Sequence, residues 1–175
     1  MSAGWVTPEE KLTPLGQTLA DAVRELQFWR DRDGKLVWET LGETLSEISF
    51  AGRHVVEIGS GMGVNLVTLQ QRGAHVLGVE PIEAYQQIGA VLWAAEGEPP
   101  VEIQIAAGED TKLADASADI VLCISSVQYC DILPLFAEIS RILRPGGQLI
   151  IYNGVMSEFI HHICLLYTSP SPRDS

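Results

Sequence analysis

Residues 55–63 read V-V-E-I-G-S-G-M-G, so three glycines recur at alternate positions directly after a β-branched run. β-Branched residues favour strands, and glycine permits the positive φ angles that a sharp turn requires. The apolar residues at 64–71 then recur at helical spacing. This segment therefore predicts a strand, a tight loop and a helix, which together form the repeating unit of parallel α/β sheets.

The same rhythm continues along the chain. Strand-like runs lie at 54–58, 75–80, 101–105, 119–124 and 148–152. Helical patterns at 64–71, 82–95 and 131–143 separate most of them, whereas residues 106–118 read as a loop. Alternating strands and helices predict right-handed crossovers. We therefore expect an α/β fold with a Rossmann-like, mostly parallel sheet covered by helices on both faces.

The chain of 175 residues is long enough for one domain with a full core. Residues 7–10, T-P-E-E, have the form of a capping box with proline at the first helical position. Helical spacing then continues to about residue 49. We expect residues 1–50 to form a helical segment that packs on the core domain, and residues 51–163 to form that domain.

The last twelve residues, 164–175, read C-L-L-Y-T-S-P-S-P-R-D-S. Two prolines, three serines and no periodicity predict a disordered tail. The stretch also resembles the in-frame translation of a transposon-derived sequencing adapter. We therefore expect a non-native tail and a natural gene that continues beyond Ile163, so that the protein is C-terminally truncated.

Composition narrows the class of partner. The net charge of -12 disfavours a nucleic-acid partner, because it repels the phosphate backbone. No apolar run is long enough to cross a bilayer, and the first residues do not form a secretory signal. The three cysteines have neither metal-ligand nor disulfide spacing. These features predict a soluble, cytoplasmic protein without a membrane partner or a metal; they leave the oligomeric state open.

The spacing of the glycines argues against a phosphate-bearing ligand. In the dinucleotide motif G-x-G-x-x-G, counted from Gly59, the last glycine falls at Val64, whereas Gly63 comes one position early. The P-loop motif requires a lysine, and none follows these glycines. Glu57 adds a carboxylate at the end of the strand, which suits a ligand with an ammonium group better than a pyrophosphate.

A second carboxylate, Glu80, closes the next strand, 21 residues after Gly59. An acid at this position can accept hydrogen bonds from both ribose hydroxyls of an adenosine. The two acids together describe a ligand that has a ribose, a positively charged end and no phosphate. S-adenosylmethionine has all three properties.

The chain resembles the class I S-adenosylmethionine-dependent methyltransferases that act on small molecules. Residues 57–63, E-I-G-S-G-M-G, match the first motif of that family, D/E-x-G-x-G-x-G. Residues 80–81 stand where the family has its ribose-binding acid. Residues 108–121 are similar to A-E-x-L-P-x-x-D-x-S-F-D-V-V, and residues 143–147, L-R-P-G-G, match the turn before the fifth strand.

The resemblance implies a cofactor site at the carboxyl ends of the strands. Its expected cofactor-binding residues are Glu57, Gly59, Ser60, Gly61, Gly63, Glu80, Pro81, Gly108, Glu109, Asp110 and Ser125. One position departs from the family, because Ala107 stands where many members have an acid that binds the adenine amino group. Adenine recognition would then fall to backbone amides near Gly108 and to Glu109 or Asp110.

The residues after the fourth strand, 125–129, S-S-V-Q-Y, bear on the methyl acceptor. They contain neither N/D-P-P-Y, typical of enzymes that methylate amino groups of adenine or glutamine, nor the Pro-Cys of cytosine-C5 enzymes. We therefore expect a small-molecule acceptor. Ser126, Gln128 and Tyr129 are the weak candidates for contacts with it, although the serines are equally explained as strand-end residues.

Two other functions remain open at this stage. A Rossmann-type NAD-dependent oxidoreductase would share the strand–helix rhythm and Glu80, but Val64 and Glu57 argue against it. A cofactor-binding fragment without turnover is the second alternative, because the family sheet has seven strands and five are recognisable here. On this view the apolar strand at 148–152 would have an unpaired outer edge, which favours self-association.

Several further residues are better explained by structure than by function. Asp119 begins a strand, and two adjacent histidines on a helix would face different ways and could not share a metal. Core packing accounts for the buried cysteine and for most of the tryptophans. The residues in this group are Asp119, Cys123, Trp29, Trp38, Trp93, His161 and His162.

Overall fold

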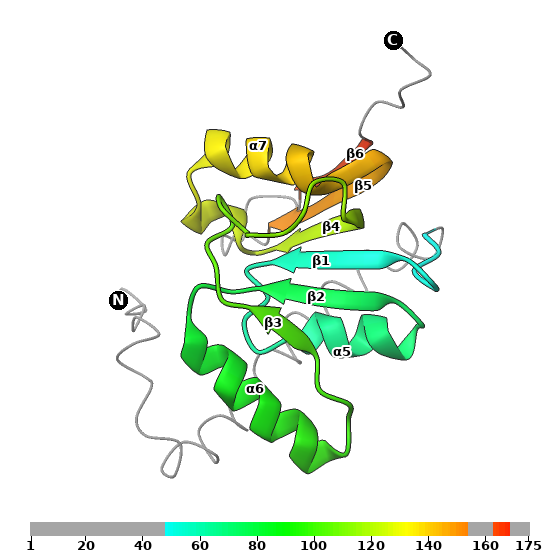
Figure 1. Ribbon diagram of the computed structural model, residues 1–175, viewed down its shortest axis with the longest axis vertical. Coiled ribbons are helices and arrows are strands. Elements are labelled where there is room, and N and C mark those ends of the chain that lie inside the picture. The colour runs from blue at the N-terminus through cyan, green and yellow to red at the C-terminus, as the bar shows by residue number, and fades with distance from the viewer. Residues whose placement is uncertain (1–47, 154–162, 169–175) are drawn as a thin grey trace.

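The computed structural model describes residues 48–153 and the backbone of residues 163–168. Strands and helices alternate along the chain, as the sequence predicts (Figure 1). The elements are β1 (His54–Ile58), α5 (Val64–Gln71), β2 (His75–Val79), α6 (Glu83–Glu96), β3 (Glu102–Gln104), β4 (Ala118–Ile124), the 3-10 helix η2 (Val127–Tyr129), α7 (Ile132–Ile142), β5 (Leu143–Asn153) and β6 (Ile163–Thr168).

These strands form one sheet in the order β3-β2-β1-β4-β5-β6. The pairs among β1 to β5 are all parallel, which confirms the predicted fold class. From β1 the chain adds β2 and β3 on one side of the sheet, and it then crosses to the other side of β1 to add β4 and β5. The strand order therefore switches between β1 and β4. In open parallel sheets ligands bind at such a switch point, beyond the carboxyl ends of the strands.

The sixth strand corrects one expectation. Residues 164–168 were expected to belong to a disordered tail, but β6 pairs antiparallel with β5, from Gln148 opposite Thr168 to Asn153 opposite Ile163. The outer edge of β5 is therefore paired and not exposed, contrary to prediction. The residue types explain this strand, because I-C-L-L-Y-T consists mostly of apolar, aromatic and β-branched residues, which favour strands. The edge of β5 also has backbone N–H and C=O groups that need hydrogen-bond partners. Residues 169–175 lie outside the described residues.

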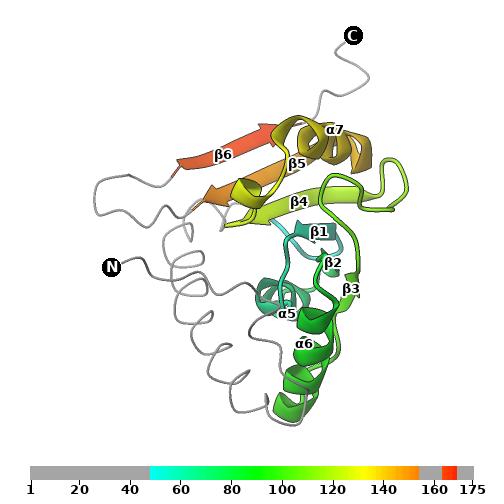
Figure 2. The same cartoon turned by 90° about the vertical axis from the view of Figure 1, so that its left-hand side faces the viewer.

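Helices cover both faces of the sheet (Figure 2). On one face, α5 packs through Leu69 against Val55 and Ile120, and α6 packs beside α5. On the other face, α7 packs through Leu135, Ile139 and Ile142, in a cluster that also contains the fully buried Cys123. Buried side chains in β1, in β4 from Ile120 onward and in β5 alternate between the two clusters, as the period of two in a strand requires. Cys123 is thus a core residue, as expected.

Some expectations fall on other parts of the chain. The N-terminal helical segment 1–50 lies almost entirely outside the described residues, as do Trp29, Trp38 and the pair His161 and His162. Among the described residues, no helix is long and apolar enough to span a membrane.

At the amino ends of the strands, Asp119 joins three segments. Its Oδ2 accepts a hydrogen bond from the His54 N–H at 2.8 Å, and its Oδ1 accepts one from Arg144 Nη1 at 2.7 Å. Burial alone raises the pKa of Asp119, but these contacts outweigh burial and the pKa is lowered. Asp119 therefore has the structural role that its position in the sequence indicates.

The connection from β3 to β4 contains no helix, as predicted, and a buried carboxylate holds it. Glu138 of α7 accepts hydrogen bonds from the Thr111 N–H at 2.8 Å and from the Thr111 hydroxyl at 2.5 Å. The guanidinium of Arg141 donates to both oxygens of the same carboxylate, at 2.6 and 2.7 Å. These contacts, led by Arg141, lower the pKa of Glu138 to about 2.

We expect Glu138→Gln to destabilise the protein by about 2 kcal/mol, because a buried charged acceptor of several hydrogen bonds is lost. The pKa of Glu138 is lower in the folded chain than its usual value, so its stabilisation is present above that value and is lost as pH falls toward 2. Urea unfolding at pH 7 and at pH 3 measures both effects. A Glu138→Gln variant that is as stable as the parent at pH 7 would contradict the assignment.

Candidate cofactor and active site

The loop between β1 and α5 requires its glycines for steric and conformational reasons. Gly59, Gly61 and Gly63 all have positive φ angles, of 73°, 54° and 84°. A Cβ atom on Gly59 would lie 2.4 Å from Cβ of Ser126, whereas one on Gly61 would meet nothing within 4 Å. Gly59 therefore allows the close approach of the segment that follows β4, and the backbone at Gly61 borders open space at the carboxyl edge of the sheet.

Most amides of this loop donate hydrogen bonds within the protein. The N–H groups of Gly59 and Ser60 both donate to the Val79 carbonyl, at 2.8 and 3.2 Å, and that of Gly63 donates to the Ser60 carbonyl at 2.9 Å. The Gly61 N–H donates to Oε2 of Glu80 at 3.0 Å. A phosphate-binding loop needs amides that point at the ligand, and these four are already engaged.

Glu80 lies directly after β2 and is 5% exposed. Its Oε1 accepts the Ile82 N–H at 3.1 Å, while its Oε2 accepts the Gly61 N–H. Burial raises the pKa of Glu80, and the two backbone hydrogen bonds oppose that effect. A carboxylate has about four lone-pair sites, so each oxygen can accept one further hydrogen bond. The geometry thus fits the predicted contact with two vicinal hydroxyls.

Glu57 lies beneath the loop and is 1% exposed. Its Oε1 accepts a hydrogen bond from Asn65 Nδ2 at 2.7 Å. Sequence reasoning did not select Asn65, although a polar residue in the first turn of a helix that is otherwise apolar on its buried face is a usable signal. The Oδ1 atom of Asn65 and the hydroxyl of Ser60 are buried without hydrogen-bond partners. The end of β1 is therefore a buried polar cluster under the glycine loop.

The turn at residues 107–110 closes another side of the site. The Asp110 N–H donates to the Ala107 carbonyl at 3.1 Å. A Cβ atom on Gly108 would lie 2.6 Å from Ile58 and 3.5 Å from the sulfur of Cys130, so this turn packs against the end of β1. Glu109 accepts the Asp131 N–H at 2.7 Å, which ties the turn to the start of α7. The side chain of Asp110 instead pairs with Lys112.

The candidate residues for the acceptor have different environments. The hydroxyl of Ser126 is buried and donates to the Ile58 carbonyl at 2.7 Å, so this residue links β1 and β4 and does not face the open edge. Ser125 has a φ of 54°, and its N–H donates to the Tyr152 carbonyl at 2.7 Å. Gln128 donates to the Ser125 carbonyl and is exposed. Tyr129 is 66% exposed, and its side chain is the large exposed hydrophobic group among these four residues.

The structure therefore brings most of the predicted residues to one edge of the sheet. The glycine loop, Glu57, Glu80, Gly108, Glu109 and Ser125 converge there, and Pro81 follows Glu80 as an exposed residue. Two residues that sequence reasoning did not assign to the site also support the loop from α6, Gly89 and Trp93.

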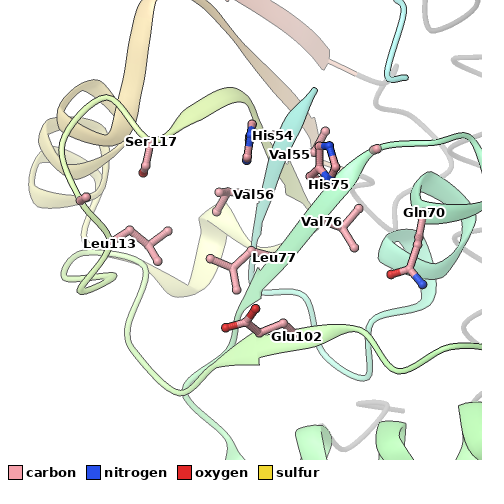
Figure 3. Close-up of a pocket in the computed structure, with 12 residues that line it drawn as sticks. His54, Val55, Val56, Gln70, His75, Val76, Leu77, Glu102, Leu113 and Ser117 are labelled. Carbon is pink, nitrogen blue, oxygen red and sulfur yellow. The ribbon is translucent and has the colours of Figure 1, made fainter. Parts of the chain in front are cut away.

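A separate cavity of about 540 Å³ lies at the opposite edge (Figure 3). Its lining includes His54 and His75, the first residues of β1 and β2, together with Leu113 and Ser117. The two imidazole rings are 5.1 Å apart. Among the described residues, no group of three histidine, cysteine or acidic side chains could hold a metal ion. None of the predicted site residues lines this cavity.

A family model described as "Methyltransferase domain" matches residues 56–151, more than half of the chain. The chain belongs to this methyltransferase family. The match confirms the family that the glycine loop and the two acids predicted, and it gives no support to the NAD-dependent oxidoreductase alternative.

Individual relatives agree with the family. An uncharacterized methyltransferase of Mycobacterium tuberculosis is 32% identical over 105 residues, which are 59% of this chain and 41% of the relative. The ubiquinone biosynthesis O-methyltransferase of Mesorhizobium japonicum is 28% identical over 152 residues, 86% of this chain and 58% of the relative. The chain thus spans roughly two fifths to three fifths of the length of these curated relatives.

Solved structures share the fold. A protein of Methanococcus maripaludis, whose own assignment as an S-adenosyl-L-methionine-dependent methyltransferase is an inference, superposes with a TM-score of 0.65 at 19% identity, over 78% of this chain and 64% of that one. The geranyl diphosphate C-methyltransferase of Streptomyces coelicolor, solved with S-adenosyl-L-homocysteine, gives 0.57 at 22% identity, over 66% of this chain and 45% of that one.

We expect Glu80→Ala to weaken binding of S-adenosylhomocysteine at least about tenfold, because charged hydrogen bonds contribute about 1.5–3 kcal/mol each. Glu80→Gln should retain one acceptor but turn its NH₂ group toward one of the two backbone donors. Its effect should therefore be smaller than that of alanine, yet measurable. Calorimetric titration of both variants gives the dissociation constants, and an unchanged value for Glu80→Ala would remove this residue from the site.

Proposed function

We propose that this protein binds S-adenosylmethionine at the carboxyl edge of its sheet and transfers the methyl group to a small-molecule acceptor. The observation that carries the proposal is the pairing of Glu80 with the glycine loop. A buried carboxylate and a loop with engaged amides together suit an adenosine ligand that has no phosphate.

The same geometry argues against a dinucleotide. A pyrophosphate needs N–H donors, but the N–H groups of this loop already donate to acceptors within the protein. They are those of Gly59, Ser60, Gly61 and Gly63. A pyrophosphate would also lie above the carboxylate of Glu57, whose charge repels an anion. A sulfonium and an ammonium group, in contrast, are attracted by that charge. The donor therefore suits the electrostatics of the loop.

Each part of the site has a role in holding the donor. Glu80 would accept the ribose hydroxyls, the turn at 107–110 would border the adenine, and Glu57 would favour the ammonium end. The donor supplies an electrophilic methyl group on a sulfonium. The protein's contribution to in-line transfer is then mainly the placement of the two reactants, which can lower the barrier by about 7–11 kcal/mol.

Exposed apolar side chains favour an acceptor with an apolar body. Tyr129 is 66% exposed, Leu133 is 81% exposed, and Ile132 and Phe136 are also exposed. All four lie in η2 and the first turns of α7, next to the Glu109 contact that joins α7 to the site. A relative named for ubiquinone biosynthesis supports an acceptor with an apolar body.

The charge of the protein supports the rest of the proposal. A net charge of -12 opposes nucleic-acid and strongly anionic acceptors, so we propose a neutral or cationic small molecule. We also propose a cytoplasmic location, since the three cysteines have no disulfide spacing. A different observation supports a second candidate function, that of a cofactor-binding unit without turnover. The chain spans only part of the length of its relatives, so the match leaves part of each relative without a counterpart.

We expect S-adenosylmethionine and S-adenosylhomocysteine to bind this chain and NAD not to bind. The reason is the engagement of the loop amides and the presence of two carboxylates. Isothermal titration with each ligand under identical conditions measures the difference. Binding of NAD that equals or exceeds binding of S-adenosylhomocysteine would refute the proposed cofactor.

Leu133→Asp should lower kcat/KM for an apolar acceptor, because a charge would replace exposed apolar surface beside the site, while the affinity for S-adenosylhomocysteine should not change. A matched control is Val91→Asp, since Val91 is an exposed apolar residue of α6, away from α7. Transfer of a radiolabelled methyl group to a panel of neutral aromatic hydroxyl compounds provides the assay. Equal loss in both variants would contradict a role for this surface, and binding without any transfer would favour the second candidate.

A further inference from the structure

We infer that Trp93 is a positioning residue of the cofactor site and that it acts through the backbone carbonyl of Met62. The inference rests on the proposed function, because its readout is the affinity for S-adenosylhomocysteine. It extends the site from the loop to helix α6, which contributes no residue to the family motifs described above.

The contact itself is direct and buried. The indole Nε1–H of Trp93 donates to the Met62 carbonyl oxygen at 2.7 Å, and Trp93 is 1% exposed. A buried indole N–H needs an acceptor, and a buried carbonyl needs a donor. Met62 stands between Gly61 and Gly63, which both have positive φ angles. The hydrogen bond therefore holds the loop where its backbone has the greatest conformational freedom.

Gly89, one turn before Trp93 on α6, leaves room for the same carbonyl because it has no side chain. A Cβ atom on Gly89 would lie 2.6 Å from the Met62 oxygen and 3.3 Å from its carbonyl carbon. Glycine within a helix is destabilising relative to alanine, so its presence in the middle of α6 calls for a local reason. The close approach of the loop provides one.

The side chain of Met62 anchors the loop in the same place. It is 4% exposed and belongs to a cluster with Val67, Ile88, Leu92 and Trp93. The loop is therefore held at two consecutive residues, because Gly61 donates to Glu80 and Met62 accepts from Trp93. Both partners come from the segment that follows β2, so one βα unit sets the conformation of the preceding loop.

This arrangement gives the site its preorganisation. If the indole N–H were absent, the Met62 carbonyl would remain buried without this donor. Rotation of its peptide group toward water would then remove the free-energy cost of the lost hydrogen bond. The neighbouring Gly61 would then lose its fixed orientation beside Glu80. A ligand would have to restore the loop upon binding, and that ordering reduces affinity.

Trp93→Phe tests the inference because it keeps an aromatic ring and removes the donor. We expect the dissociation constant for S-adenosylhomocysteine to rise about three- to tenfold, the range that corresponds to loss of one hydrogen bond. The control is Leu92→Val, which removes volume from the same cluster, because the aliphatic side chain of Leu92 cannot donate a hydrogen bond to the loop. Its dissociation constant should equal that of the parent.

Two further measurements separate positioning from general destabilisation. Gly89→Ala retains the indole but displaces the same carbonyl, so it should weaken binding at least as much as Trp93→Phe. In a ¹H–¹⁵N spectrum of the parent, the indole signal that is absent from Trp93→Phe should shift during the titration and saturate with the ligand's own dissociation constant.

The outcomes are distinguishable. If the parent binds S-adenosylhomocysteine and Trp93→Phe binds it equally well, the inference is overturned while the proposed function stands. If Leu92→Val weakens binding as much as Trp93→Phe does, packing and not the hydrogen bond is responsible, and the inference is again overturned. If the parent does not bind, the proposed function fails and the inference fails with it.

Discussion

The carboxylate of Glu80 is the interaction on which the site depends. It is buried after β2, and it joins two successive strand-to-helix connections by accepting the N–H groups of Gly61 and Ile82. A buried carboxylate without such donors would be costly. Its hydrogen bonds therefore require both connections to adopt their observed conformations, and the loop in turn determines which ligands can approach.

The rest of the site is arranged around that constraint. The Val79 carbonyl continues the β1–β2 ladder into the loop by accepting from Gly59 and Ser60, while Trp93 supports the far side of the loop through Met62. Another buried carboxylate, Glu138, holds the β3–β4 connection, which carries Gly108, through Thr111. Two acids, one directly after β2 and one in α7, thus hold the glycine loop and the β3–β4 connection.

Much of the fold could be predicted because its signals are local. The bounds of β1 and α5 agree with the predicted ranges, since a β-branched run, a glycine turn and an apolar helix are each encoded by adjacent residues. β5 starts earlier than predicted, at Leu143, because pairing of Leu143 with Ala118 extends the ladder through a turn-like sequence. β6 was not foreseen, because its apolar and β-branched residues form a strand only where a distant partner, the edge of β5, supplies the hydrogen bonds.

The sequence by itself determined the fold class, the position of the glycine loop and the positions of the two acids that we propose select the ligand, because residue type and spacing carry that information. Only the tertiary structure decided how those groups are used. In it, the buried Ser126 hydroxyl donates to the Ile58 carbonyl, and Glu109 accepts a hydrogen bond at the start of α7. Trp93 of α6 donates to the Met62 carbonyl. Such contacts join residues from 22 to 68 positions apart. They depend on the packing of elements across the sheet, which no local pattern in the chain specifies.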